Sequence, residues 1–161
     1  MDTYEAAFAA LIQRHRDALG RLCRHYEASA EARRDLEQEI LLSLWTASEH
    51  FRGDCSERTF VYRVAHNVAA THVLRAVRDG KRRDEPAEPA VSTEATLEAR
   101  SALARLEARL RLLDLGSQQL VLLALEGCST AEMAAVTGLS TTNVTTRLSR
   151  ARQALSEETS S

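Results

Sequence analysis

The sequence has few of the residues that interrupt helices, with only six glycines and two prolines in 161 residues. Its commonest residues, Ala, Leu, Arg and Glu, are strong helix formers. The chain is also too short for a large catalytic barrel or a doubly wound sheet enzyme. Composition and length together predict an all-α protein of one domain or two small lobes.

Cysteine is scarce as well, and Cys23, Cys55 and Cys128 are an odd, widely spaced set. That number and spacing exclude a disulfide framework and a CxxC zinc knuckle, so a reduced compartment is expected. The histidines and cysteines also lack the short loop spacing of metal ligands. With no glycine-rich phosphate loop, nucleophile elbow or paired carboxylates, we expect no metal, no cofactor and no enzyme.

The chain has no excess of positive charge and no long apolar run. Its formal net charge is -2 and its pI is near 6.2, so nucleic-acid binding would have to depend on local patches. Charged residues break up the first 25 positions, and about 18 apolar residues never occur in succession. The sequence therefore predicts a cytoplasmic protein that neither spans a membrane nor carries a signal peptide.

One segment divides the chain. Residues 79–93, DGKRRDEPAEPAVST, contain both prolines and almost no apolar side chain, which is typical of a flexible linker. It would separate a lobe of residues 1–78 from a lobe of residues 94–161. In the first lobe, apolar residues recur with a helical period over 4–26, 31–49 and 60–78, and Gly53 lies in a turn before the third stretch. A three-helix bundle is expected there.

The second lobe begins with a predicted helix over residues 93–114, capped by Ser92 or Thr93. Its apolar face would consist of Leu97, Leu103, Leu106 and Leu110. A short, very apolar helix over residues 117–126 would follow and end at Gly127.

Residues 129–155 have the pattern of a helix-turn-helix. Ser129 and Glu132 form a capping box, Gly138 can adopt the positive φ of a tight turn, and Ser140 can cap the next helix. On that last helix Val144, Leu148, Ala151 and Leu155 share one stripe, which predicts the buried face.

Polar residues cover the opposite face of the last helix. Short hydroxyls and amides can approach base edges, and flanking arginines can reach phosphates, as a major-groove helix requires. A merely solvated polar face is the alternative. No Lys or Arg occurs between Arg111 and Arg147, so the counterion-release contribution is small and this lobe alone should bind DNA weakly.

A basic patch lies in the first lobe. Residues 57–83 carry seven Lys or Arg against two acidic residues, with Phe51, Phe60 and Tyr62 close by. Cations that hold a backbone and rings that stack on bases are suited to single-stranded or melted nucleic acid. The alternative is a solvated basic face beside core aromatics.

Three segments carry a family resemblance. DLEQEILLSLW from residue 35, FRGDCSERTFVYRVAHNVAATHVLR from residue 51 and LEGCSTAEMAAVTGLSTTNVTTRLSRARQAL from residue 125 resemble regions 2 and 4 of the extracytoplasmic-function sigma factors of bacterial RNA polymerase. Their order and spacing cover nearly the whole chain. The resemblance implies a specificity subunit that binds core polymerase and directs initiation at promoters.

The resemblance also implies roles for individual residues. The contact with the β′ clamp helices would be made by Asp35, Leu36, Gln38, Glu39, Leu42 and Trp45. The minus-ten element would be read by Phe51, Arg58, Arg63, His66, Asn67, His72, Arg75 and Arg78. The minus-thirty-five element would be read by Thr141, Thr142, Asn143, Thr145, Thr146, Arg147, Ser149, Arg150 and Arg152. The partners implied are core polymerase through its β′ and β subunits, promoter DNA and an anti-sigma factor.

Two other functions fit parts of the sequence. A stand-alone helix-turn-helix regulator would use only the second lobe and would need a dimer, for which no heptad seam is visible. A sigma-like protein-interaction module would bind no nucleic acid and would show no salt-dependent DNA binding.

Overall fold

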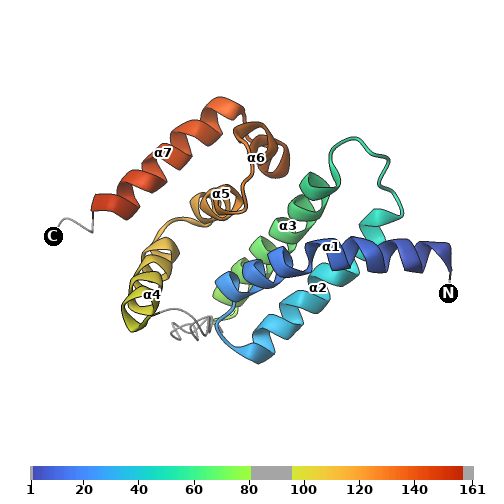
Figure 1. Cartoon of the computed structure of the whole chain (residues 1–161), viewed down its shortest axis with the longest axis horizontal. Coiled ribbons are helices and arrows are strands. Elements are labelled where there is room, and N and C mark those ends of the chain that lie inside the picture. Colours follow the sequence, from blue (N-terminus) through green and yellow to red (C-terminus); the bar gives the residue numbers. More distant parts are fainter. Residues whose placement is uncertain (1, 81–95, 158–161) are drawn as a thin grey trace. The chain divides into compact units, whose positions relative to one another are not determined.

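A computed structural model describes residues 2–80 and 96–157, and its helices fall into two compact units, α1–α3 and α4–α7 (Figure 1). No strand occurs among these described residues. The prediction of an all-α chain with two helical lobes is confirmed. Most of the predicted linker, including Lys81, Arg82 and Arg83, lies outside the described residues.

The first unit consists of α1 (Thr3–Tyr26), α2 (Ala30–Ser48) and α3 (Glu57–Arg78). Serine caps fix where the last two begin. The Ser29 hydroxyl accepts from the Ala32 amide at 3.1 Å, and that of Ser56 accepts from the Thr59 amide at 3.1 Å. Each cap satisfies one of the amides that a first helical turn leaves without a partner, so the helix starts are set locally.

The core of this unit is built around one stripe of α2. Leu36, Ile40 and Leu44 are almost completely buried. α2 packs against both other helices, whose buried residues include Val61, Ala65 and Ala69 of α3 and Leu19, Leu22, Cys23 and Tyr26 of α1. Burying each large aliphatic side chain contributes about 2 kcal/mol, so the stripe fixes the rotation of α2 within the bundle.

The second unit consists of α4 (Leu97–Leu112), α5 (Leu115–Leu125), α6 (Thr130–Thr137) and α7 (Thr141–Glu157). The predicted helix over 93–114 is corrected at its C-terminal end. It stops at Leu112 because Asp114 caps the next helix, its Oδ1 accepting from the Ser117 amide at 2.7 Å. Thr96 caps α4, while Ser92 and Thr93 lie outside the described residues.

The predicted apolar face of α4 is buried only near its end. Leu110 is buried, but Leu97 is 83% exposed and Leu103 and Leu106 are exposed as well. The spacing of these leucines therefore gave the correct helix and the wrong degree of burial. Within its own unit, α4 leaves a row of leucines uncovered.

The helix-turn-helix of α6 and α7 is confirmed in its local detail. Ser129 and Glu132 form the predicted capping box, and Gly138 has a φ of 78°. The Ser140 hydroxyl accepts from the Asn143 amide at 3.1 Å and so caps α7. Any side chain at Gly138 would be strained by this backbone conformation, so glycine fixes the turn.

Replacing Leu36 with Ala should lower the free energy of unfolding of the first unit by about 3 kcal/mol, because it leaves a cavity beneath α2. Replacing Leu42, which is 68% exposed on the same helix, should cost less than about 0.5 kcal/mol. Urea titration followed by Trp45 fluorescence reports on this unit alone, since Trp45 is the one tryptophan of the chain. Equal losses for the two variants would contradict the assigned rotation of α2.

Candidate nucleic-acid interface

The predicted minus-thirty-five residues all lie on the exposed side of α7. Val144, Leu148 and Ala151 are buried on the other side of the helix, against α5 and α6. The exposed residues are Thr141, Thr142, Asn143, Thr145, Thr146, Arg147, Ser149, Arg150 and Arg152. The structure thus brings the whole predicted set onto one presented helix at the end of a capped helix-turn-helix.

Arg147 is held in place on this helix. The Nε of Arg147 donates to Asn143 Oδ1 at 3.2 Å. The Nη1 of Arg147 lies so close to Gly116 of α5 that a Cβ at that glycine would be only 3.4 Å away. The guanidinium therefore rests against the first turn of α5. Arg150 and Arg152, which are exposed farther along α7, can extend toward a phosphate backbone.

The exposed face of α2 is narrower than predicted. Asp35, Gln38 and Leu42 are exposed, and they lie on one side of the helix at spacings of three and four. Two half-buried residues border this face. Trp45 packs edge-on against Tyr4 and Phe8 of α1, at centroid distances of 4.6 and 5.0 Å, while Glu39 faces α3.

The structure corrects the assignment of Leu36 to this face. Its side chain is 0% exposed and belongs to the buried stripe with Ile40 and Leu44. The physical reason is rotation, because consecutive helical residues point about 100° apart and Leu36 follows the exposed Asp35 directly. Leu36 therefore supports the face from inside and cannot contact a partner.

The predicted minus-ten residues of α3 do not share one face. Asn67, Arg75 and Arg78 are exposed, and Arg63 is half-buried beside them. Arg58 is also half-buried, but it lies about 180° around the helix from Asn67. Thr71 is exposed between Asn67 and Arg75, and sequence reasoning did not include it.

His66 is a second correction. It is only 5% exposed, and its ring lies edge-on to that of Tyr26 in the core, with Nδ1 3.4 Å from the Tyr26 hydroxyl. Its position on α3 falls on the same side as the buried Ala65 and Ala69. A side chain held there cannot reach DNA, so His66 is a core residue.

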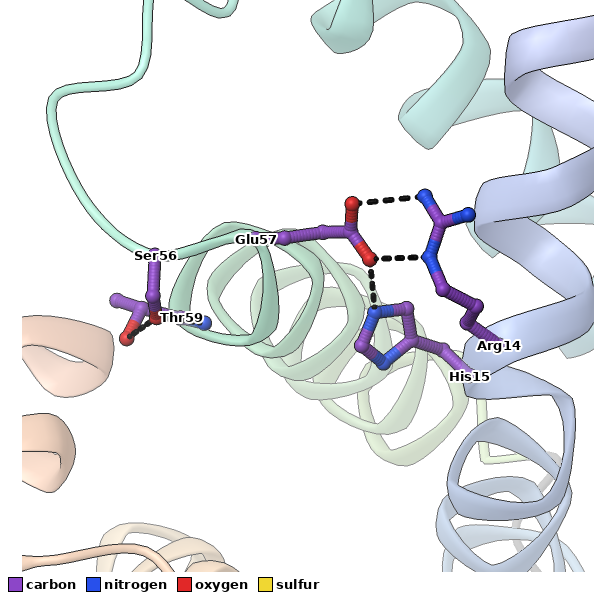
Figure 2. A network of polar contacts seen from close by, with 5 residues as sticks. All are labelled: Arg14, His15, Ser56, Glu57 and Thr59. Atoms are coloured by element: carbon purple, nitrogen blue, oxygen red, sulfur yellow. Dashed lines mark hydrogen bonds and ion pairs between the residues drawn. The ribbon is translucent and has the colours of Figure 1, made fainter.

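The turn between α2 and α3 is anchored at both ends. At its start Phe51 stacks on the buried Phe60, with ring centroids 4.3 Å apart and planes 24° apart. At its end the Ser56 hydroxyl donates to Thr59 Oγ1 at 2.9 Å (Figure 2). Arg52 to Asp54 are exposed between these anchors. The turn is thus a small exposed element on fixed supports.

A network that sequence reasoning missed joins α1 to the first residue of α3. Arg14 donates from Nε and Nη2 to the two carboxylate oxygens of Glu57, both at 2.8 Å, and His15 Nε2 lies 2.8 Å from Oε1 (Figure 2). The hydrogen bond from Arg14 is the largest cause that lowers the pKa of Glu57 to about 2. No local pattern could have revealed it, because the partners lie 42 and 43 positions apart.

A second network connects all three helices of the first unit. His72 of α3 places Nε2 2.8 Å from Glu27 Oε1, beyond the end of α1, and Nδ1 3.4 Å from Glu39 Oε2 on α2. Arg75 Nη1 lies 3.8 Å from the other oxygen of Glu39. Glu39 therefore sits between the exposed face of α2 and two predicted nucleic-acid residues of α3.

Cys23 is a buried thiol of the first unit. Burial raises the pKa of the Cys23 thiol to about 12, which keeps it protonated and a poor nucleophile at neutral pH.

Within residues 2–80 and 96–157, no three His, Cys, Asp or Glu side chains gather as a metal site would need. No helix in those ranges is both long and apolar enough to cross a membrane.

Comparison with known proteins matches both units to one family. Residues 11–79 match Sigma-70 region 2, and residues 99–155 match Sigma-70 region 4. The RNA polymerase sigma factor CnrH of Cupriavidus metallidurans is 31% identical over 94% of this chain and 86% of its own length. The chain belongs to the extracytoplasmic-function sigma factors.

Further relatives agree with this family. The RNA polymerase sigma factor NccH of Alcaligenes xylosoxydans xylosoxydans is 31% identical to this sigma factor over 92% of the chain and 84% of NccH. The structure of CnrH in complex with the cytosolic domain of CnrY is 29% identical, with a TM-score of 0.70 over 97% of this chain and 89% of that one.

A more distant structure supports the fold alone. It is the sigma factor RpoE in complex with the anti-sigma factor NepR from Bartonella quintana. It is 20% identical to this chain and has a TM-score of 0.78 over 94% of this chain and 95% of that one.

Replacing Glu57 with Gln should destabilise the first unit of this sigma factor by about 1 kcal/mol at pH 7, a value reduced by solvent screening because the side chain is 38% exposed. The carboxylate has a lowered pKa, so its contribution is complete above its usual pKa of 4.5 and is lost as the pH falls toward about 2. Urea titrations should therefore show the two proteins converging below pH 4.5.

The control for this experiment is the exposed Glu49, whose replacement with Gln should leave stability nearly unchanged at every pH. A Glu57 effect that stays constant from pH 7 to pH 3 would contradict the assignment to the ionised carboxylate.

Proposed function

We propose that this sigma factor binds core RNA polymerase through the exposed face of α2 and contacts promoter DNA through α3 and α7. Asp35, Gln38 and Leu42 would dock on the β′ clamp helices, with Glu39 and Trp45 at the borders of the contact. An exposed leucine flanked by polar groups suits a helix-to-helix interface, in which an apolar centre is surrounded by a polar rim. Contacts to the β subunit would come from the second unit.

The observation that carries this proposal is the composition of the exposed side of α7. Its hydroxyl and amide groups can reach base edges, and Arg150 and Arg152 can reach phosphates on either side. The buried stripe on the other side packs the helix into its unit. We assign it to the duplex minus-thirty-five element.

The minus-ten element would be read by α3 and the preceding turn. Asn67, Arg75 and Arg78 offer an amide and two cations on the exposed side of α3, with Arg63 beside them. Phe51, stacked on Phe60, offers a ring at the base of the turn, where an unpaired base can stack. His72 lies at the edge of this surface and His66 is excluded from it.

The charge distribution explains why polymerase is needed. No Lys or Arg lies between Arg111 and Arg147, so few phosphate contacts are available to the second unit and its affinity for DNA alone is low. When both units are held on one polymerase, binding by one raises the effective concentration of the other. The two weak contacts with DNA then act together and select a promoter.

The relatives suggest how this chain is regulated and in which compartment it acts. Structures of CnrH with the cytosolic domain of CnrY and of RpoE with the anti-sigma factor NepR are known, and we infer that a comparable protein inhibits this chain. The uncovered leucines of α4 provide apolar surface for such a partner. We further propose that the chain acts in the bacterial cytoplasm and performs no catalysis itself.

Run-off transcription tests the proposal as a whole. Purified core polymerase is supplied with genomic fragments, with and without this chain, and discrete transcripts should appear only when the chain is present. A chain that binds a palindromic site as a dimer and leaves polymerase unaffected would instead support the stand-alone regulator.

Replacing Asp35, Gln38 and Leu42 together with Ala should abolish copurification with core polymerase, because the triple variant removes the centre of the proposed interface. The far-ultraviolet circular dichroism should remain unchanged, since all three side chains are exposed. Replacing Glu31, exposed near the start of α2, with Ala serves as the control and should copurify normally. Undiminished copurification of the triple variant would reject the α2 interface.

Two single replacements in α7 should give different results. Replacing Thr146 with Ala should relax the base preference at one position of the minus-thirty-five element, with a discrimination of about 1 kcal/mol lost, because a hydroxyl makes a single contact with a base edge. Replacing Arg152 with Ala should weaken transcription from all promoter variants by a similar factor, since a phosphate contact carries no base information. Transcription from a set of single-base promoter variants measures both, and identical profiles for the two proteins would contradict the assignment.

A further inference from the structure

We propose that Glu39 occupies the phosphate-binding position formed by His72 and Arg75, and that polymerase releases this position by drawing Glu39 into its own interface. The inference deepens the proposed function and rests on it. In the free chain the carboxylate of α2 would compete with a nucleic-acid phosphate for the two side chains of α3. The sigma factor would thereby limit its own binding to DNA before it meets polymerase.

The geometry brings the competing groups together. One oxygen of Glu39 lies 3.4 Å from His72 Nδ1 and the other lies 3.8 Å from Arg75 Nη1. His72 and Arg75 are three residues apart on α3 and so project from neighbouring positions on it. Carboxylates and phosphates accept hydrogen bonds from the same donors, so a phosphate would have to displace Glu39 to bind both side chains. Arg75 is a donor in every state, whereas His72 can donate from Nδ1 beside Glu27 only when both of its ring nitrogens carry a proton.

The two carboxylates around His72 are not equivalent. The side chain of Glu27 is 20% exposed and has the shorter contact, 2.8 Å to Nε2. The side chain of Glu39 is 41% exposed and its contacts are longer. Glu27 is therefore placed to hold the imidazole ring in position, whereas Glu39 is the carboxylate that can leave.

The pair formed by Glu39 and Arg75 is weak enough to exchange. Both side chains are substantially exposed, Arg75 at 52%, and exposed ion pairs add little to stability because solvent screens them. The repulsion between the Glu39 carboxylate and an approaching phosphate is stronger than this small stabilising effect, because the two anions would compete for the same position. The main effect of the Glu39 carboxylate is thus to compete with phosphate for His72 and Arg75, and its effect on the stability of the first unit is minor.

The position of Glu39 on α2 supplies the connection to polymerase. It lies one helical turn after Asp35 and borders the exposed face that also carries Gln38 and Leu42. A partner that covers this face would meet the Glu39 carboxylate at the edge of the interface. A new cationic partner there would free His72 and Arg75 for DNA.

The test compares Glu39→Gln with Glu37→Gln in the full chain without polymerase. Both variants lose one negative charge from α2. Glu37, however, lies about 200° around the helix from Glu39, on the side toward Cys23. The pKa of the Cys23 thiol is raised mainly by burial and next by the charge of Glu37, which agrees with this position. Fluorescence anisotropy with a single-stranded oligonucleotide of mixed sequence, over several salt concentrations, gives affinity and salt dependence.

We expect Glu39→Gln to bind roughly 3- to 10-fold tighter than the original chain, with a salt slope steeper by about 0.7 for each added phosphate contact. Glu37→Gln should change the affinity by less than about 2-fold, as a general charge effect would. Adding Arg75→Ala to Glu39→Gln should remove the gain. Equal gains for the two single variants would overturn the proposal, as would a gain that survives the loss of Arg75.

A second measurement isolates the role of polymerase. With saturating core polymerase and a forked promoter fragment, the advantage of Glu39→Gln should fall to near 1-fold, because polymerase has already removed the competitor. An undiminished advantage would overturn the release step. Run-off transcription by the original chain reports on the proposed function separately, so a failed competition test beside normal transcription would reject only this inference.

Discussion

Leu36, Ile40 and Leu44 bury one side of α2 between its neighbours, and the other side chains of this helix are placed by that constraint. With the stripe fixed, Asp35, Gln38 and Leu42 must face outward, Trp45 must lie against α1, and Glu39 must lie against α3. A rotation of α2 by one residue position would bring Glu37 or Asp35 into the place of the buried Leu36, and burying an unpaired carboxylate costs several kcal/mol, a large part of the stability of a small unit. The exposed face of α2, which we propose as the binding face, is therefore a consequence of the core.

A buried stripe also determines which side chains of α7 are exposed. Val144, Leu148 and Ala151 fix its rotation, and the hydroxyls, amide and arginines on the other side are presented as a set. In the second unit no Lys or Arg lies between Arg111 and Arg147, and in the first unit His72 and Arg75 are already engaged by Glu27 and Glu39. We therefore expect the free chain to bind DNA with modest affinity and to select promoters only when polymerase holds both units.

The caps and the turn of the helix-turn-helix were predictable because their signals are local, whereas Leu155 of the predicted buried stripe is only half-buried. Ser129 with Glu132, Gly138 and Ser140 specify caps and a turn within a few residues of themselves. Leu36 and His66 were misplaced because the resemblance assigned them roles without showing which side of each helix packs into the core. The error on α4 is the reverse, because the spacing of its leucines predicted a buried face that is largely exposed. The contacts of Glu57 with Arg14 and His15 depend on how three helices pack, which no short pattern encodes.

The central claim is that polymerase supplies the affinity and the chain supplies the choice of site. It is tested most directly by measuring the dissociation constant for promoter DNA and for a scrambled duplex at one fixed salt concentration, with the free chain and with the chain bound to core polymerase. We expect the free chain to bind both duplexes weakly and without preference, and the complex to prefer the promoter strongly. A free chain that discriminates between the two duplexes as well as the complex does would contradict it.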